Sequence, residues 1–168
     1  MIFAEAAYDY LKYSEDSETL EKHLYPAVKK IFKAYREGIP GVLRMASDGL
    51  IEILDETKPR TWMDAVAEEI PVTLRNGKPV EINALWYNAI RILGEWAAKF
   101  RDPGLEEECR KLSQKVKESF NRLFWNEAGK YLHDTVKGTA ADSSLRPNQI
   151  FAISPYFPVL EETRWKAV

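Results

Sequence analysis

The chain has 168 residues, a net charge of −2 and a pI near 5.8; 45% of the residues are hydrophobic and 30% are charged. This composition fits one folded domain and excludes a disordered chain, because it supplies enough apolar surface for a core. The charge balance lacks the basic excess with which proteins bind nucleic acid or anionic membranes. No apolar run approaches the roughly 18–20 residues that span a bilayer. We therefore expect neither nucleic acid nor a membrane as a partner.

The single cysteine, Cys109, excludes an internal disulfide and is typical of a reducing compartment. The N-terminal stretch MIFAEAAYDYLKYSED has no basic segment before a long apolar core, so it does not resemble a signal peptide. These features favour a cytoplasmic location. The chain contains no C-x-x-C or H-E-x-x-H motif and no dinucleotide-binding glycine pattern, so we expect no metal site and no cofactor.

Apolar residues at helical spacing predict a hairpin of two helices at the N-terminus. A stripe of apolar residues between residues 20 and 35 predicts the second of these helices. Pro26 should kink or restart that helix, and Gly38 should end it. The residues expected on the inner face of the first helix are Phe3, Ala6, Ala7, Tyr10 and Leu11.

Residues 39–80 change character, because short apolar runs there are separated by prolines and by the pair Asn76-Gly77. An Asn-Gly pair flanked by apolar residues is the strongest short-range signal of a β-hairpin, so we expect one between Val72 and Val80. We interpret the whole segment as a long connection with small β-ribbons. Long, structured connections in compact domains tend to carry function.

The helical period returns in residues 81–100 and again in 101–125, which predicts a second pair of helices with Cys109 in the core. A turn and a short strand follow in 126–138, and a short helix should begin with Pro147 at its first position. The fold class that these elements predict is all-α: helical hairpins, with small β-ribbons in the loops.

A set of acids, amides, cations and indoles lies in or beside the long connection, and such a set suits a neutral polyol, since an indole can cover the apolar face of a sugar. Glycoside hydrolysis adds two needs, a carboxylic acid kept protonated by a partly apolar setting and a second carboxylate across the sugar. Trp62 and Met63 could provide that setting for Asp64. The polar and aromatic residues concerned are Asp48, Asp55, Trp62, Asp64, Arg75, Lys78, Glu81, Asn83, Trp86 and Asn88.

Structural roles remain open for these residues. Asp64 could cap a short helix that begins at Ala65, and Trp62 could close the end of the helical bundle. Glu81 stands where an acid favours the helix dipole. Arg75 flanks a turn, where an exposed position is usual, and the same holds for Lys78; Trp86 lies on the core stripe. Spacing alone does not decide between these roles and a sugar site.

Four segments resemble the C-terminal catalytic region of glycogen debranching enzymes, the amylo-α-1,6-glucosidase family: DGLIEI, RTWMDA, PVTLRNGKPVEINALWYNAI and LRPNQIFAIS. The resemblance covers nearly the whole chain, in order. It implies an (α/α)6 toroid, in which helical hairpins surround a funnel. It also implies hydrolysis, with inversion and without a cofactor, of the single α-1,6-linked glucose at a branch point. The partner would be an α-glucan or a branched maltooligosaccharide.

The resemblance assigns Asp64 as the general acid and Trp62 as a wall of the glucose subsite. Glu81 could be the second carboxylate on this chain, but we expect it to line the pocket and bind substrate, because the family places its catalytic base beyond Val168. The residues expected to bind substrate around these are Asp48, Arg75, Lys78, Asn83, Trp86, Asn148 and Gln149. Leu74 departs from the family, which commonly has proline there, and VAEEI replaces a segment that contains glycine. Both changes affect the stiffness of the loop more than its chemistry.

The length implies that residues 1–168 form a single partial toroid domain, truncated at both ends relative to the family. Three interpretations follow. The chain is part of an active glycosidase, or it is a non-catalytic remnant that binds α-glucan or acts as a helical interaction module. In the third, it is a helical scaffold whose aromatic loops only pack. Helix faces left uncovered in a partial toroid would suit a homo-oligomer or a complementing chain.

Overall fold

The computed structural model describes all residues from 1 to 168 and is mostly helical, with small antiparallel sheets in the loops. The α-helices are α1 (Ile2–Ser14), α2 (Ser17–Thr19), α3 (Tyr25–Glu37), α4 (Val80–Lys99) and α5 (Pro103–Leu123). A π-helical turn, Leu20–Leu24, joins α2 to α3, and two 3-10 helices, Pro147–Ala152 and Glu162–Ala167, lie in the C-terminal part. The all-α prediction with β-ribbons in the loops is confirmed at this level.

The helix starts and stops follow from local chemistry. Asp102 caps α5, because its Oδ1 accepts a hydrogen bond from the Leu105 amide at 3.2 Å and Pro103 takes the first helical position. Pro26 lacks an amide proton, and α3 begins anew at Tyr25 after the π-helical turn, as predicted. Gly38 follows α3 with a positive φ of 78°, which agrees with its predicted role.

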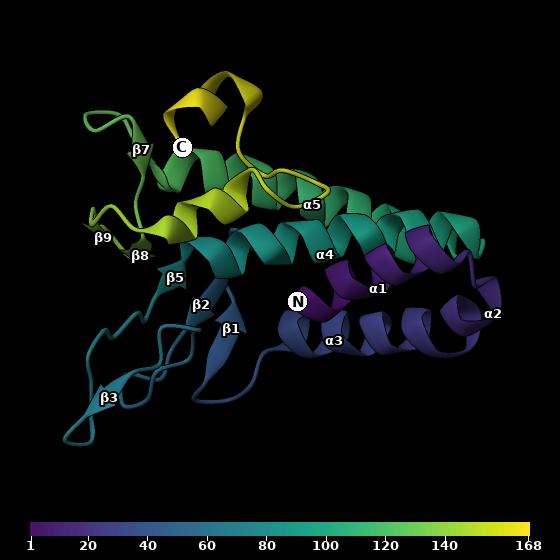
Figure 1. Ribbon diagram of the computed structural model, residues 1–168, viewed down its shortest axis with the longest axis horizontal. Helices are drawn as coiled ribbons and strands as arrows, with labels where there is room; N and C mark the ends of the chain where they lie inside the picture. The colour runs from purple at the N-terminus through teal and green to yellow at the C-terminus, as the bar shows by residue number, and fades with distance from the viewer.

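Helix α4 lies at the centre of the fold, with α5, α1 and α3 packed around it (Figure 1). The inner face predicted for α1 was wrong in part. Ala4 and Ala7 are buried, whereas Phe3 and Tyr10 are 43% and 44% exposed. Both faces of α1 carry apolar residues, and small alanines allow a closer approach of two helices than aromatic rings do.

Nine short strands form four antiparallel sheets. The strands are β1 (Leu43–Met45), β2 (Ile51–Ile53), β3 (Val66–Ala67), β4 (Ile70–Pro71), β5 (Lys78–Pro79), β6 (Trp125–Asn126), β7 (Tyr131–Leu132), β8 (Thr135–Lys137) and β9 (Ala140–Asp142). β1 pairs with β2, β3 with β4, and β6 with β7, while β8 lies between β5 and β9. The β-ribbons predicted for the long connection are therefore present.

The hairpin predicted at Asn76-Gly77 was wrong. The tight turn of this segment is at Glu68 and Glu69, which join β3 to β4 with φ of 48° and 65°. Gly77 instead lies between two other chain segments, bridged to Ile53, and β5 pairs with the distant β8. A Cβ at Gly77 would lie 2.7 Å from the Val136 carbonyl oxygen, so glycine here serves a close approach of two backbones.

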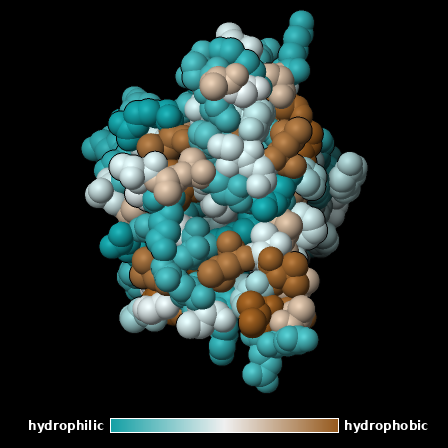
Figure 2. Space-filling model, turned by 90° about the vertical axis from the view of Figure 1, so that its left-hand side faces the viewer, coloured by the Kyte–Doolittle hydropathy of each residue, from teal (hydrophilic) through white to brown (hydrophobic).

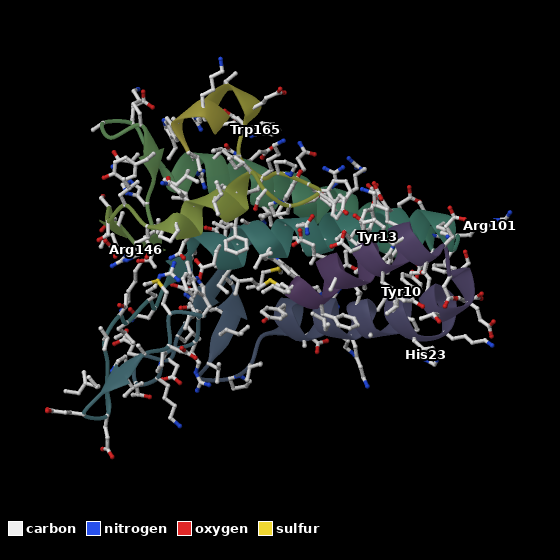
Figure 3. All side chains as sticks on the ribbon, viewed as in Figure 1. Tyr10, Tyr13, His23, Arg101, Arg146 and Trp165 are labelled. Carbon is white, nitrogen blue, oxygen red and sulfur yellow. The ribbon has the colours of Figure 1, made fainter.

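All four small sheets gather at one end of the helices, with the β3–β4 hairpin extending furthest from the body (Figure 1). Figure 3 shows Arg146 at this end, which we call the loop end, and Arg101 at the opposite end. Viewed from the loop end, separate hydrophobic patches alternate with hydrophilic side chains (Figure 2). None of the helices combines the length and the hydrophobicity needed to cross a bilayer.

Candidate functional site

A buried arginine at the loop end binds two carboxylates. Arg75 donates from Nη1 and Nη2 to the two oxygens of Glu81 at 2.5 and 2.6 Å. It also donates from Nε and Nη2 to the two oxygens of Asp134 at 2.7 and 2.9 Å. The three side chains are 1–2% exposed. We call these three residues the ionic cluster.

Three elements bring the ionic cluster together. Arg75 precedes β5, Glu81 stands in the first turn of α4, and Asp134 lies between β7 and β8. The β5–β8 pairing and a backbone bond from the Val80 amide to the Asp134 carbonyl, 2.9 Å long, hold these elements in register. Burial alone would lower the pKa of the Arg75 guanidinium, but its hydrogen bonds to Glu81 and Asp134 raise it above its usual value. Arg75 therefore stays charged.

Two further side chains complete the surroundings of Asp134. Asn148, in the first turn of the 3-10 helix, donates from Nδ2 to Asp134 Oδ1 at 2.6 Å. Arg146 donates from Nη1 to Asp134 Oδ2 at 2.7 Å and to Asp142 Oδ2 at 2.6 Å. Burial alone would raise the pKa of Asp142, but hydrogen bonds from Arg146 and Ser144 lower it to about 2. Arg146 thus brings a second positive charge to the edge of the ionic cluster.

The segment that follows β2 and ends before Arg75, residues 54–74, carries the predicted general acid, and we call it the Trp62 loop. Trp62 is 61% exposed, and its Nε1 donates to Asn148 Oδ1 at 2.9 Å. Asp64 is exposed and makes no ion pair or side-chain hydrogen bond within the chain. It precedes strand β3, so the alternative of capping a helix at Ala65 was wrong. The carboxylate of Asp64 is free to meet a ligand.

Two of the other residues predicted to bind substrate pair with each other. Lys78 donates from Nζ to Asp48 Oδ2 at 2.5 Å, and both side chains are partly exposed. Asn83 is fully buried and binds the backbone of Ile51 from both ends of its amide. It therefore ties β2 to α4, and its burial leaves no atom for a ligand.

Trp86 and Gln149 also bind backbone atoms of the chain. Trp86 is fully buried, stacks on Phe32 and donates from Nε1 to the Gly49 carbonyl at 3.1 Å. Gln149 is half-buried, and its Oε1 accepts from the Leu132 amide at 3.2 Å. The structure thus brings most of the predicted residues to the loop end, but gives the buried ones contacts within the protein.

Asp134 and Arg146 were not among the predicted site residues. Asp134 is separated from Arg75 by 59 positions, and only the β5–β8 pairing brings the two together. One chemical signal could have pointed to Asp134. The connection holds Arg75 close in sequence to Glu81, and a buried arginine has five donors, which one carboxylate does not satisfy. Arg146 belongs to the segment LRPNQ that carries the family resemblance.

Three grooves of about 510–540 Å³ lie along the helices, and none includes Trp62 or Asp64. One lies between α4 and α5, and another is lined by Tyr8, Trp96 and Tyr156. No three His, Cys, Asp or Glu side chains come together as a metal ion would require. Around Asp64 the site offers one exposed acid and one exposed indole, beside a buried ionic cluster.

The exposed groups at the loop end suit a neutral, hydroxyl-rich ligand. Trp62 offers an exposed aromatic face, Asp48 and Lys78 offer partly exposed polar atoms, and Asp64 offers a carboxyl group. A family model described as amylo-alpha-1,6-glucosidase matches residues 1–168, the whole chain. No curated protein matches the chain in a sequence comparison. The chain therefore belongs to the amylo-alpha-1,6-glucosidase family.

Proposed function

We propose that the chain is part of a glycoside hydrolase that removes α-1,6-linked glucose at the branch points of glycogen or a related α-glucan, with inversion and without a cofactor. The match to the family over residues 1–168 carries this proposal. The exposed Asp64 beside the exposed Trp62 supports it. The single unpaired Cys109 fits the reducing cytoplasm as its location.

In this proposal residues 1–168 form one partial domain of an (α/α)6 toroid. The antiparallel hairpins α1–α3 and α4–α5 lie side by side, and the loops that carry the predicted residues extend from the same end (Figure 1). That placement suits a funnel whose mouth is at the loop end. The open surroundings of Asp64 suit a mouth that is completed by further elements.

Asp64 would donate a proton to the glycosidic oxygen as the bond to C1 breaks, while a second carboxylate takes a proton from the attacking water on the opposite face. In inverting enzymes the two carboxyl groups stand roughly 6.5–9.5 Å apart. Glu81 is the candidate on this chain, but Arg75 engages both of its oxygens and it is 2% exposed. Glu81 would therefore need Arg75 to turn away before it could act on water.

The test is glucose release from a singly branched maltooligosaccharide by the wild type, Asp64→Asn and Glu81→Gln. Removal of a general acid should lower kcat by about 10²–10⁴-fold, and the first product should be the β-anomer, detected by proton NMR. Activity that survives Asp64→Asn would show that Asp64 is not the proton donor. The α-anomer as first product would exclude inversion.

The second candidate is a helical interaction module, favoured by the apolar side chains that α1 leaves exposed. Ile2, Phe3, Tyr10 and Tyr13 are between 43% and 83% exposed, and Figure 3 shows Tyr10 and Tyr13 on α1. A second copy of the chain or a complementing chain would cover them. Sedimentation velocity of the wild type and Tyr13→Ser tests self-association. A wild type that is a monomer at all concentrations would contradict self-association.

A further inference from the structure

The side chain of Asn148 joins the Trp62 loop to the ionic cluster. Its Oδ1 accepts a hydrogen bond from Trp62 Nε1 at 2.9 Å, and its Nδ2 donates to Asp134 Oδ1 at 2.6 Å. The same Nδ2 contacts Met63 Sδ at 3.4 Å. One amide thus binds the two residues directly before Asp64 and, at the same time, a carboxylate of the ionic cluster.

The Trp62 loop has few other tethers. Between residues 61 and 74, the only hydrogen bonds that leave the segment end on Asn148. The remaining bonds there are internal, such as the Val72 amide to the Ala65 carbonyl at 2.9 Å. A segment with exposed side chains and so few external bonds opens locally at low cost. The contacts with Asn148 therefore decide where Asp64 lies relative to the body.

Asn148 is itself held in one orientation. It is fully buried, and Asp134, its acceptor, is bound by both Arg75 and Arg146. Because Asp134 can only accept, Nδ2 must face it and Oδ1 must face the indole. The contact with Asp134 is charge-assisted and stronger than a neutral hydrogen bond.

We propose that Asn148 is a positioning residue that latches the Trp62 loop to Asp134 and so fixes Asp64 at the site. Full burial prevents Asn148 from touching a bound sugar, so this role replaces the substrate contact expected from the sequence. The catalytic part of the inference rests on the proposed function, whereas the latch itself does not. A displacement of a catalytic group by about 1 Å can lower the rate about 10²-fold, which makes such a latch consequential.

The latch is tested on the full chain by the rate of trypsin cleavage between Arg60 and Thr61, measured by mass spectrometry of the intact and cleaved protein. Trp62→Phe keeps an aromatic ring but removes the N–H donor, and Asn148→Ala removes both contacts. The loss of one hydrogen bond should speed this cleavage about fivefold in Trp62→Phe, and Asn148→Ala should speed it more. If Trp62→Phe is cleaved at the wild-type rate, the latch is overturned. This result decides the matter even if Asn148→Ala does not fold.

Two matched controls should keep the wild-type cleavage rate. Trp125→Phe removes an indole donor that binds Glu127, away from the Trp62 loop. Asn121→Ala removes a buried amide that binds the backbone of the C-terminal segment at Val159 and Glu161. Faster cleavage at Arg60 in the folded controls would show a general loosening and overturn the latch.

Enzyme kinetics separate the two parts of the inference. If the wild type releases glucose, Asn148→Ala should lower kcat about 10²-fold with little change in KM, because positioning is lost and not binding. An unchanged kcat despite faster cleavage would overturn positioning while the latch stands. Faster cleavage in both variants, combined with a wild type that releases no glucose, would support the latch and show that residues 1–168 alone do not form an active glycosidase.

Discussion

The ionic cluster and the Trp62 loop are adjacent, yet the protein holds them in opposite ways. In the cluster, Arg75, Glu81 and Asp134 are almost fully buried and bind one another through four bonds of 2.5–2.9 Å. In the loop, Asp64 is exposed and pairs with nothing. The charges that shape the site are thus fixed in the body, while the acid proposed to react remains open to a ligand. Rigidity and reactivity are assigned to different residues.

The largest expected effect comes from breaking the ionic cluster. Arg75→Leu leaves Glu81 buried without its partner and leaves Asp134 with Arg146 as its one remaining cation, which should lower the free energy of unfolding by about 3–5 kcal/mol. Arg60→Leu is the matched control in the Trp62 loop, since its pair with Asp55 is partly exposed and should contribute at most about 1 kcal/mol. Urea denaturation measures both. Equal losses would show that the two regions do not differ.

The next effect concerns the junction where the Trp62 loop meets the body. Gly77→Ala places a Cβ 2.7 Å from the Val136 carbonyl oxygen at a φ of 86°. Gly138→Ala has a similar positive φ of 59° but meets nothing within 4 Å. The strain of a positive φ should lower the stability of both variants by about 1–2 kcal/mol. The clash should lower the stability of Gly77→Ala by about 1–3 kcal/mol more. Similar melting temperatures for the two variants would refute the close approach.

A smaller effect should appear in acid at the edge of the ionic cluster. The folded-state pKa of Asp142 is about 2, below its unfolded value of 3.8. Its contribution to stability is therefore complete above pH 3.8 and is lost as the pH falls through 2. Because Asp142 is partly exposed, the contribution should stay below about 1 kcal/mol. Asp142→Asn should flatten the dependence of the urea midpoint on pH in this window.

Asp64→Asn is the control for that measurement, because Asp64 makes no ion pair in the folded chain. The urea midpoint of Asp64→Asn should change with pH in this window as that of the wild type does. A curve for Asp142→Asn that also follows the wild type would show that Arg146 does not stabilise the ionised Asp142.

The smallest expected effect is the labelling of Cys109, which the folded wild type should resist. Burial, together with the negative charges of Glu108 and Asp102, raises the pKa of its thiol to about 12. At pH 8 a disulfide reagent should therefore react only when the core opens. Arg75→Leu should speed this reaction and Trp62→Phe should not, because the loop opens without the core. Rapid labelling of the folded wild type would contradict the burial.

Local signals predicted much of the fold correctly. Pro26, Gly38 and Pro147 act on their own backbone, so their effects follow from the residues alone. Cys109 faces the core because its place in the helical period determines it. The errors arose where distant segments compete. Both faces of α1 are apolar, and only contact with α4 selects the alanine face. The Asn76-Gly77 pair has a strong hairpin preference that the pairing of β5 with β8 overrides.

The candidate site was predicted as a region, but not as a network. The Trp62–Asp64 segment and Arg75 follow from composition and from the resemblance. Asp134 does not, because its link to Arg75 depends on strand pairing across 59 positions. The burial of Asn148 was equally hidden, since an amide that begins a 3-10 helix has no periodic pattern to show which way it faces.

The burial of α4 has a consequence for how the chain folds. Fourteen of its 20 residues are buried, against six of 21 in α5, so α4 has almost no side suited to water. During synthesis α4 emerges after α1 and α3 but before α5 and the 3-10 helix at residues 147–152, so the apolar surface that these later elements cover stays exposed until they follow. We expect pairing with the adjacent α5 to come first, which rapid-mixing hydrogen exchange during refolding would detect as early protection of both helices. Simultaneous protection of α1 would exclude that order.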